Sequence, residues 1–289
     1  MARPPPEQDV AAVRRLARRL GLGGVRPVIL KIANHTTVRL HPLPLVARVR
    51  SFDAGGLDGS LDFMSRELSL ARHLAAAGAP AVRPSVDPEA GPYEQDGSAI
   101  SLWTHVDHRP VEGVSERFAA VAALRKVYDA LASYEGPLPS FERAISYCRE
   151  LLDDPFALSA APAGVREFLD AQYRRAYEAI PWSSLQAVPL HGDTHLGNVL
   201  MTDRGPIWCD FEGVCLGPLE WDLRCLKATS RASFEPIDPT LLAQLRVLGR
   251  VMTTVWCWAE ADRSPEIREG AEYHLAVLRR RERLRGGGA

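Results

Sequence analysis

Three oxygen-bearing side chains in the second half of the chain have the types and the order that phosphoryl transfer requires. Asp193 and Asn198 lie five residues apart, and Asp210 follows a short apolar run and precedes Phe211. A carboxylate can orient or deprotonate an acceptor hydroxyl, while a carboxamide oxygen and a second carboxylate can hold magnesium against a triphosphate. The pattern predicts Asp193 as the catalytic residue, and Asn198 and Asp210 as ligands of Mg²⁺.

The residues around these three resemble a known family. Residues 191–198 read HGDTHLGN, residues 207–212 read IWCDFE, and residues 217–223 read GPLEWDL. The series is similar to the His-Gly-Asp-x-His-x-x-Asn loop, the Asp-Phe turn and the later Asp-Leu phrase of the aminoglycoside phosphotransferase-like small-molecule kinases. That family includes antibiotic kinases and choline kinases. The resemblance covers about residues 25 to 280.

The resemblance implies an α+β, bilobal, protein-kinase-like fold with a small antiparallel-sheet N-lobe and a larger, mainly helical C-lobe. Residues 1–104 would form the nucleotide-binding lobe with an N-terminal helix, residues 105–285 the catalytic and substrate-binding lobe, and residues 286–289 a disordered tail. ATP and Mg²⁺ are the implied cofactors. The implied reaction is ATP-dependent O-phosphorylation of a small-molecule hydroxyl, with Asp222 accepting backbone amides of the catalytic loop.

The catalytic phrase also allows two simpler interpretations. Alternating His and Asp, as in residues 191–195, can bind zinc, but a catalytic zinc site needs three protein ligands and leaves Asn198 and Asp210 without a role. Asp and Asn are also common in ordinary loops because their side chains bond to nearby backbone. Three matching phrases in one order favour phosphoryl transfer.

A cation for the nucleotide phosphates is expected near the N-terminus. Residues 7–20 have the apolar spacing of a helix, and residues 25–32, 36–40 and 45–49 read as strands. Arg48 occupies the place of the lysine in the kinase Val-Ala-Ile-Lys strand. Alternatives are a solvent-facing Arg48 on an edge strand, or Lys31 as the phosphate cation.

A helix predicted over residues 60–77 supplies the partner of this cation. In kinases a glutamate from the helix after the third strand pairs with the phosphate cation, and Glu67 has that place in the order of elements. A solvated Glu67 paired with Arg66 or Arg72 is the alternative. Glu212 replaces the glycine of Asp-Phe-Gly and is expected in the outer shell of the metal or facing the substrate.

The remaining nucleotide contacts are expected from a turn and a hinge. The first turn between strands has no glycine, so Asn34 and Thr36 are the candidates for phosphate contact, with an exposed polar hairpin as the alternative. Residues 93–103 predict a hairpin with an Asp-Gly turn. In the resembled fold the segment after it binds adenine, which implies Trp103, His105 and Val106. Trp103 could instead be a core aromatic.

The rest of the chain is predicted to be mainly helical. Apolar residues recur at helical spacing in five segments: 114–134, 141–152, 163–180, 239–262 and 265–284. Short strands are expected on either side of the catalytic phrases: 188–190, 199–201 and 207–209. The catalytic side chains would therefore lie on loops held by short strands between helical blocks.

Composition argues against several classes of partner. A formal net charge of −1 provides no basic field for nucleic acid or an anionic membrane, and no apolar stretch is long enough to span a bilayer. The N-terminus has no hydrophobic signal segment, so a cytoplasmic protein, a monomer or weak dimer, is expected.

The sequence does not identify the compound that accepts the phosphoryl group. Aminoglycosides and other antibiotics are candidates, which would imply a role in antibiotic resistance. Choline-like compounds, sugars and amino-alcohols are candidates as well. The missing turn glycines and the arginine at position 48 support one alternative function, a catalytically weak nucleotide-binding regulatory protein.

Overall fold

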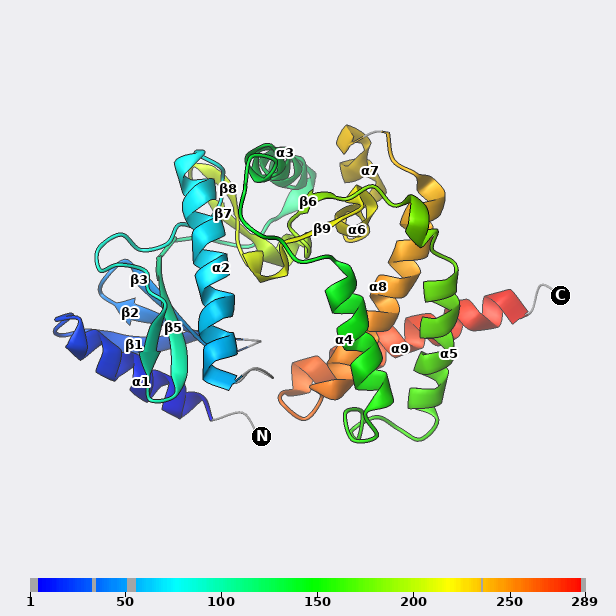
Figure 1. Ribbon diagram of the computed structural model, residues 1–289, viewed down its shortest axis with the longest axis horizontal. Helices are drawn as coiled ribbons and strands as arrows, with labels where there is room; N and C mark the ends of the chain where they lie inside the picture. The colour runs from blue at the N-terminus through cyan, green and yellow to red at the C-terminus, as the bar shows by residue number, and fades with distance from the viewer. Residues whose placement is uncertain (1–4, 33–34, 51–55, 235, 287–289) are drawn as a thin grey trace. The chain divides into compact units, whose positions relative to one another are not determined.

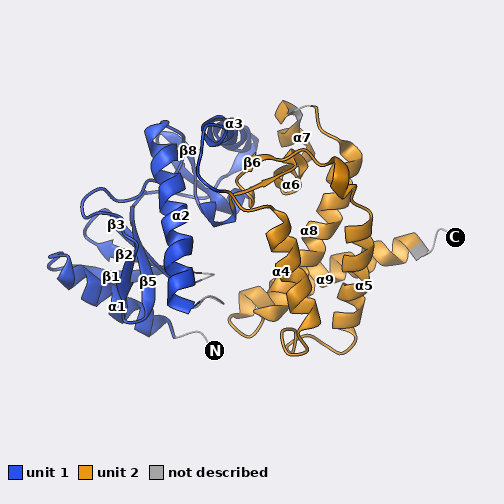
Figure 2. Cartoon of the chain, viewed as in Figure 1, with its two compact units in different colours: residues 1–137, 195–213 blue, residues 138–194, 214–289 orange. Residues whose placement is uncertain are grey.

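A computed structural model describes residues 5–32, 35–50, 56–234 and 236–286, with strands mainly in the N-terminal part and long helices toward the C-terminus (Figure 1). The chain contains two compact units. The first combines residues 1–137 with 195–213, and the second combines residues 138–194 with 214–289 (Figure 2). The division into a nucleotide-binding lobe and a catalytic lobe after residue 104 remains a prediction. Of the predicted tail, Gly286 ends the last helix and residues 287–289 lie outside the described part.

The first unit is built on a five-stranded antiparallel sheet with the order β1-β2-β3-β5-β4. Its strands are β1 (Arg26–Ile32), β2 (Thr36–His41), β3 (Leu45–Arg50), β4 (Tyr93–Gln95) and β5 (Ser98–Thr104). Between β4 and β5, Asp96 and Gly97 both have positive φ, 56° and 74°, as a two-residue hairpin turn requires. The predicted strands and hairpin are confirmed.

Two helices cover opposite faces of this sheet. Helix α1 (Pro6–Arg19) packs Ala12, Val13 and Leu16 against one face. Helix α2 (Gly56–Ala76) packs Leu68 and Ala71 against Trp103 on the other. Side chains alternate along a strand, so the two faces have different residues.

The register assigns Arg48 to one of these faces. Val46 pairs with Trp103 and Arg48 pairs with Ser101, and paired residues share a face. Since Trp103 packs against α2, the sheet carries Arg48 on the α2 side.

A second hairpin belongs to the same unit. It is formed by β7 (Val199–Thr202) and β8 (Gly205–Trp208), and it packs against α3 (Gly113–Leu131). The fully buried Trp208 donates its indole N–H to the Ala120 carbonyl at 2.9 Å and its backbone N–H to the Pro80 carbonyl at 2.8 Å. These bonds fix the hairpin whose ends carry Asn198 and Asp210.

The second unit is mainly helical. Its long helices are α4 (Glu142–Asp153), α5 (Val165–Glu178), α8 (Pro239–Ala259) and α9 (Pro265–Gly286), which share one apolar core. Strand β6 (Val188–Leu190) pairs with β9 (Cys215–Gly217), and the short helices α6 (Leu219–Leu223) and α7 (Ala228–Arg231) follow. The predicted helices are confirmed to within a few residues, whereas β9, α6 and α7 were not predicted. Within the described residues, no helix combines the length and apolar character needed to cross a bilayer.

The N-terminus of α8 provides a direct test of the second unit. Asp238 accepts the N–H groups of Thr240 and Leu241 at 2.7 and 3.1 Å. We expect Asp238→Ala to lower the free energy of unfolding by about 1 kcal/mol, because two amides lose their acceptor. Urea denaturation measures the loss. The matched variant Asp238→Asn retains an acceptor oxygen and should stay near the native value, and equal losses in both would contradict the capping role.

Candidate active site

A buried ion network occupies the α2 side of the sheet. The Arg48 guanidinium pairs through Nη1 with Glu67 Oε1 and through Nη2 with Asp210 Oδ1 at 3.1 Å. The side chains of Arg48 and Glu67 are only 14% and 2% exposed. The alternatives of a solvent-facing Arg48 and a solvated Glu67 are therefore wrong. Lys31, the competing cation, is exposed on β1.

The members of this network depend on one another electrostatically. Burial lowers the pKa of Arg48, but the negative charges of Glu67, Asp210 and Glu212 raise it by more, so the pKa is raised overall. The pKa of Glu67 is raised because burial disfavours its charged form, an effect that the charge of Arg48 opposes. Arg48 thus stays cationic, and Glu67 relies on it as a counter-charge.

His35 and Glu212 extend the network. His35, 4% exposed, lies 3.1 Å through Nδ1 from Glu212 Oε2 and 3.3 Å from Arg48 Nη2, and Arg48 Nη2 lies 3.6 Å from Glu212 Oε2. Sequence reasoning missed His35. A signal existed in the strand alternation: Thr36 pairs with Val49, so the residue before Thr36 lies beside the row of Arg48 and Arg50.

Asn198 and Asp210 are adjacent across the base of the β7–β8 hairpin. The Cys209 N–H donates to the Asn198 carbonyl at 2.9 Å, and Val199 pairs with Trp208. Asp210 has φ of 67°, a left-handed conformation that few residues other than glycine adopt and that is common at functional sites. A carboxamide and a carboxylate are the hard oxygen donors that Mg²⁺ prefers, so this donor set fits the metal.

The zinc interpretation of the catalytic phrase requires a cluster of metal-binding side chains. Among the described residues, no group of three or more His, Cys, Asp or Glu side chains is arranged to hold a metal ion.

The catalytic phrase of the second unit is held by one buried carboxylate. Asp222, which is fully buried in α6, accepts the N–H groups of His191 and Gly192 at 2.8 Å each. The Thr194 hydroxyl donates to the Asp222 carbonyl at 2.5 Å. The predicted bracing role of Asp222 is confirmed. The bonds fix the backbone on both sides of Asp193.

Asp193 itself is only partly buried. Its backbone N–H donates to His191 Nδ1 at 3.4 Å, and His191 is fully buried, so this histidine makes a structural contact within the loop. Asp193 is described with the second unit, and Asn198 with the first. Its catalytic role remains a prediction.

Of the two turn residues, only Thr36 is described. Thr36 is fully buried, and its hydroxyl donates to Asp9 of α1. Its side chain therefore lies on the α1 side of the sheet, opposite Arg48, and serves a structural contact. A phosphate contact through the Thr36 backbone remains a prediction. Asn34 lies outside the described residues.

The three hinge candidates differ in their surroundings. Trp103 is 4% exposed, packs with Leu68, and donates its indole N–H to Ser101 Oγ at 2.9 Å, so its side chain belongs to the core. The His105 N–H donates to the Pro44 carbonyl at 2.8 Å, and the Val106 carbonyl lies 2.8 Å from His108 Nδ1. Binding of adenine by the backbone of this segment remains a prediction.

Solved structures share this fold. A choline kinase LicA from Streptococcus pneumoniae superposes with a TM-score of 0.62 at 11% identity, covering 91% of this chain and 98% of that one. A choline/ethanolamine kinase family protein from Mesorhizobium loti gives 0.58 at 19% identity, covering 94% and 93%. APH(2")-IIIa, in complex with GDP and kanamycin, gives 0.65 at 12% identity, covering 94% and 98%. The predicted α+β, bilobal, kinase-like fold is confirmed.

Comparison at the level of sequence identifies a family. No curated protein matches the chain. The sequence model described as "Phosphotransferase enzyme family" matches residues 19–261, a span that includes every site residue discussed above. The match covers well over half of the 289 residues, and the chain therefore belongs to the phosphotransferase enzyme family.

Proposed function

We propose that this chain is an ATP-dependent O-phosphotransferase that phosphorylates a hydroxyl group of a small molecule. The observation that carries the proposal is the network in which Arg48 joins Glu67 of α2 to Asp210, with Asn198 beside Asp210. A cation paired with a helix glutamate, and a carboxylate and an amide for magnesium, are the groups that position a nucleotide for phosphoryl transfer.

The ligands bound in similar solved structures support the classes of reactant. APH(2")-IIIa was solved with GDP and kanamycin, and a spectinomycin phosphotransferase with ADP and spectinomycin. Each complex pairs a nucleotide with a small hydroxylated compound. We extend to this chain only these classes, a nucleotide as donor and a small-molecule hydroxyl as acceptor.

In the proposed mechanism the chain's residues mainly position the reactants. Asp193 accepts a hydrogen bond from the acceptor hydroxyl and takes its proton as that oxygen bonds to the γ-phosphorus, while the bond from the γ-phosphorus to the β–γ bridging oxygen breaks. Asp222 keeps the loop around Asp193 rigid. Arg48 contributes positive charge for the nucleotide phosphates. When bound by Asn198 and Asp210, Mg²⁺ would neutralise phosphate charge.

The first test separates catalysis from nucleotide binding. We expect Asp193→Asn to lower acceptor-dependent ATP consumption by about 10²–10⁴-fold, because the hydroxyl loses its general base. Thermal melting with ATP and magnesium should still show stabilisation, because ligand binding to the native state raises stability. In Asp210→Asn, both turnover and the magnesium-dependent shift should be lost.

Two results would count against this assignment. Unchanged turnover in both variants would remove the mechanism. A magnesium-dependent ATP shift without turnover on any acceptor would favour the alternative of a nucleotide-binding regulatory protein. The variant Asp203→Asn, in the exposed turn between β7 and β8, is the matched control and should behave as the native chain.

The second test concerns Arg48. We expect Arg48→Met to lower the free energy of unfolding by about 3–5 kcal/mol, because it leaves Glu67 buried without its cation. Adding Glu67→Gln should restore much of that stability, since the unpaired charge is removed. Urea denaturation of the single and double variants measures both effects.

The conservative variant Arg48→Lys tests the role of Arg48 in nucleotide binding. Arg48→Lys retains the charge but loses the planar fork, so it should fold and weaken ATP binding by about tenfold. If Arg48→Met were as stable as the native chain, the buried pair would not have the structural importance assigned here.

A further inference from the structure

The segment that follows Asp222 is rich in unpaired positive charge. Arg224, Lys227 and Arg231 lie in or between α6 and α7, and Arg246 lies on α8, which packs against α6. Within the part of the chain that the structure describes, no carboxylate lies within 4.0 Å of the three arginines. Arg149 and Arg175 of the same unit, by contrast, each pair with a carboxylate.

The carboxylates of the same segment are committed to backbone amides. Both oxygens of Asp222 accept N–H groups of the catalytic loop. Glu220 Oε1 accepts the Asp238 N–H at 3.0 Å, and Asp238 in turn caps α8. The acidic groups therefore serve the fold, and the arginines are left as the dominant charges.

Packing holds Arg224 in place. Its Cζ lies 3.5 Å from the centre of the Trp221 ring, and its Nη1 donates to the Trp221 carbonyl. A Cβ added to Gly249 of α8 would lie 2.6 Å from Arg224 Nε, so a larger residue at position 249 would displace this side chain. Arg246 is three residues before Gly249 and hence on the same face of α8.

Arg231 and Arg246 are like charges held within electrostatic range. Partial burial and the positive charge of Arg246 both lower the pKa of Arg231. One Arg231 N–H donates to the Leu226 carbonyl at 3.0 Å, which orients the side chain. Like charges brought together without a counter-charge are destabilising unless an anion binds between them.

Helix α6 links this positive cluster to the loop that carries the predicted catalytic residue. Burial and the negative charge of Asp193 raise the pKa of Cys225, which lies between α6 and α7, whereas the positive charges of Arg224 and Arg246 lower it. Arg224 follows Asp222 by two residues, and Asp222 binds the two amides that precede Asp193. The cluster and the catalytic loop are therefore joined through α6 within one unit.

We infer that the acceptor carries an anionic group, a carboxylate or a phosphate, which Arg246 and Arg231 bind while Asp193 orients the hydroxyl that is phosphorylated. The inference rests on the proposed phosphotransferase function and specifies its substrate class. Guanidinium groups suit both anions because their planar N–H fork matches two oxygens at once. A polycationic acceptor such as an aminoglycoside would meet like charge at this place, which disfavours its binding.

The test compares acceptors that differ in charge on a similar skeleton. ATP consumption is measured with glucuronate and glucose 6-phosphate, with neutral glucose, and with glucosamine and kanamycin. The anionic compounds should support turnover and the cationic compounds should not. For the best anionic acceptor, Arg246→Glu should raise KM by about tenfold or more, with KM for ATP unchanged, and Arg246→Lys should restore most of the loss.

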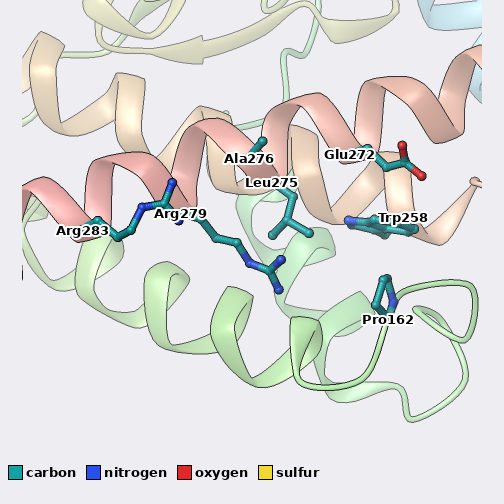
Figure 3. A pocket seen from close by; sticks show the side chains of 7 residues that line it. All are labelled: Pro162, Trp258, Glu272, Leu275, Ala276, Arg279 and Arg283. Atoms are coloured by element: carbon teal, nitrogen blue, oxygen red, sulfur yellow. The ribbon is translucent and has the colours of Figure 1, made fainter.

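A matched control uses an arginine from another surface of the same unit. Arg283 of α9 lines a separate groove with Pro162 and Trp258 (Figure 3). Arg283→Glu makes the same charge change and should leave the KM of the acceptor unaltered.

The outcomes distinguish this inference from the function on which it rests. Turnover with kanamycin or glucosamine but with neither anion would overturn the inference and leave the phosphotransferase function intact. A rise in KM for ATP in Arg246→Glu, with no change for the acceptor, would also overturn it, because the cluster would then serve the nucleotide. No turnover with any compound, together with no magnesium-dependent shift in thermal melting with ATP, would overturn the function itself.

Discussion

The buried pairing of Arg48 with two carboxylates is the constraint on which the site of the first unit depends. Removing a guanidinium from water is costly, and it is tolerated here because Glu67 and Asp210 supply counter-charges from different elements. The pairing fixes α2 against the sheet and holds the Asp210 carboxylate at the Arg48 guanidinium. The arginine takes part in folding as well as in the proposed binding of phosphate, so replacement of the usual lysine has consequences for both.

In the second unit, the charged side chains around the loop of Asp193 have different roles. Asp222 is fully buried, and each of its carboxylate oxygens accepts one backbone amide, so it holds the loop around Asp193 in place. Arg224 and Arg231, which follow it, donate to backbone carbonyls and have no carboxylate partner among the described residues. In the proposed reaction, rigidity matters because the acceptor hydroxyl must be held within hydrogen-bonding distance of Asp193. We infer that this short segment both supports the loop and selects the acceptor.

Periodicity and residue order predicted much of this arrangement. The Arg48–Glu67 pair followed from the resemblance to kinases, in which a strand cation pairs with a glutamate of the next helix. The Asp-Gly turn between β4 and β5 followed from local backbone preference. The direction of the Thr36 side chain did not, because it depends on which face α1 covers. His35 was missed because the strand alternation that places it beside Arg48 and Arg50 becomes informative only when the register of β2 against β3 is known. The short elements β9, α6 and α7 lack the length that a periodic pattern needs.

We propose that Asn198 and Asp210 hold a divalent metal against the triphosphate, and the rest of the proposed mechanism depends on this binding. Binding of Mn²⁺, used in place of Mg²⁺, can be measured by electron paramagnetic resonance with and without ATP. We expect tight Mn²⁺ binding only when ATP is present, weakened by about tenfold or more in Asp210→Asn. Equal binding of Mn²⁺ and ATP by the native chain and by Asp210→Asn would contradict it.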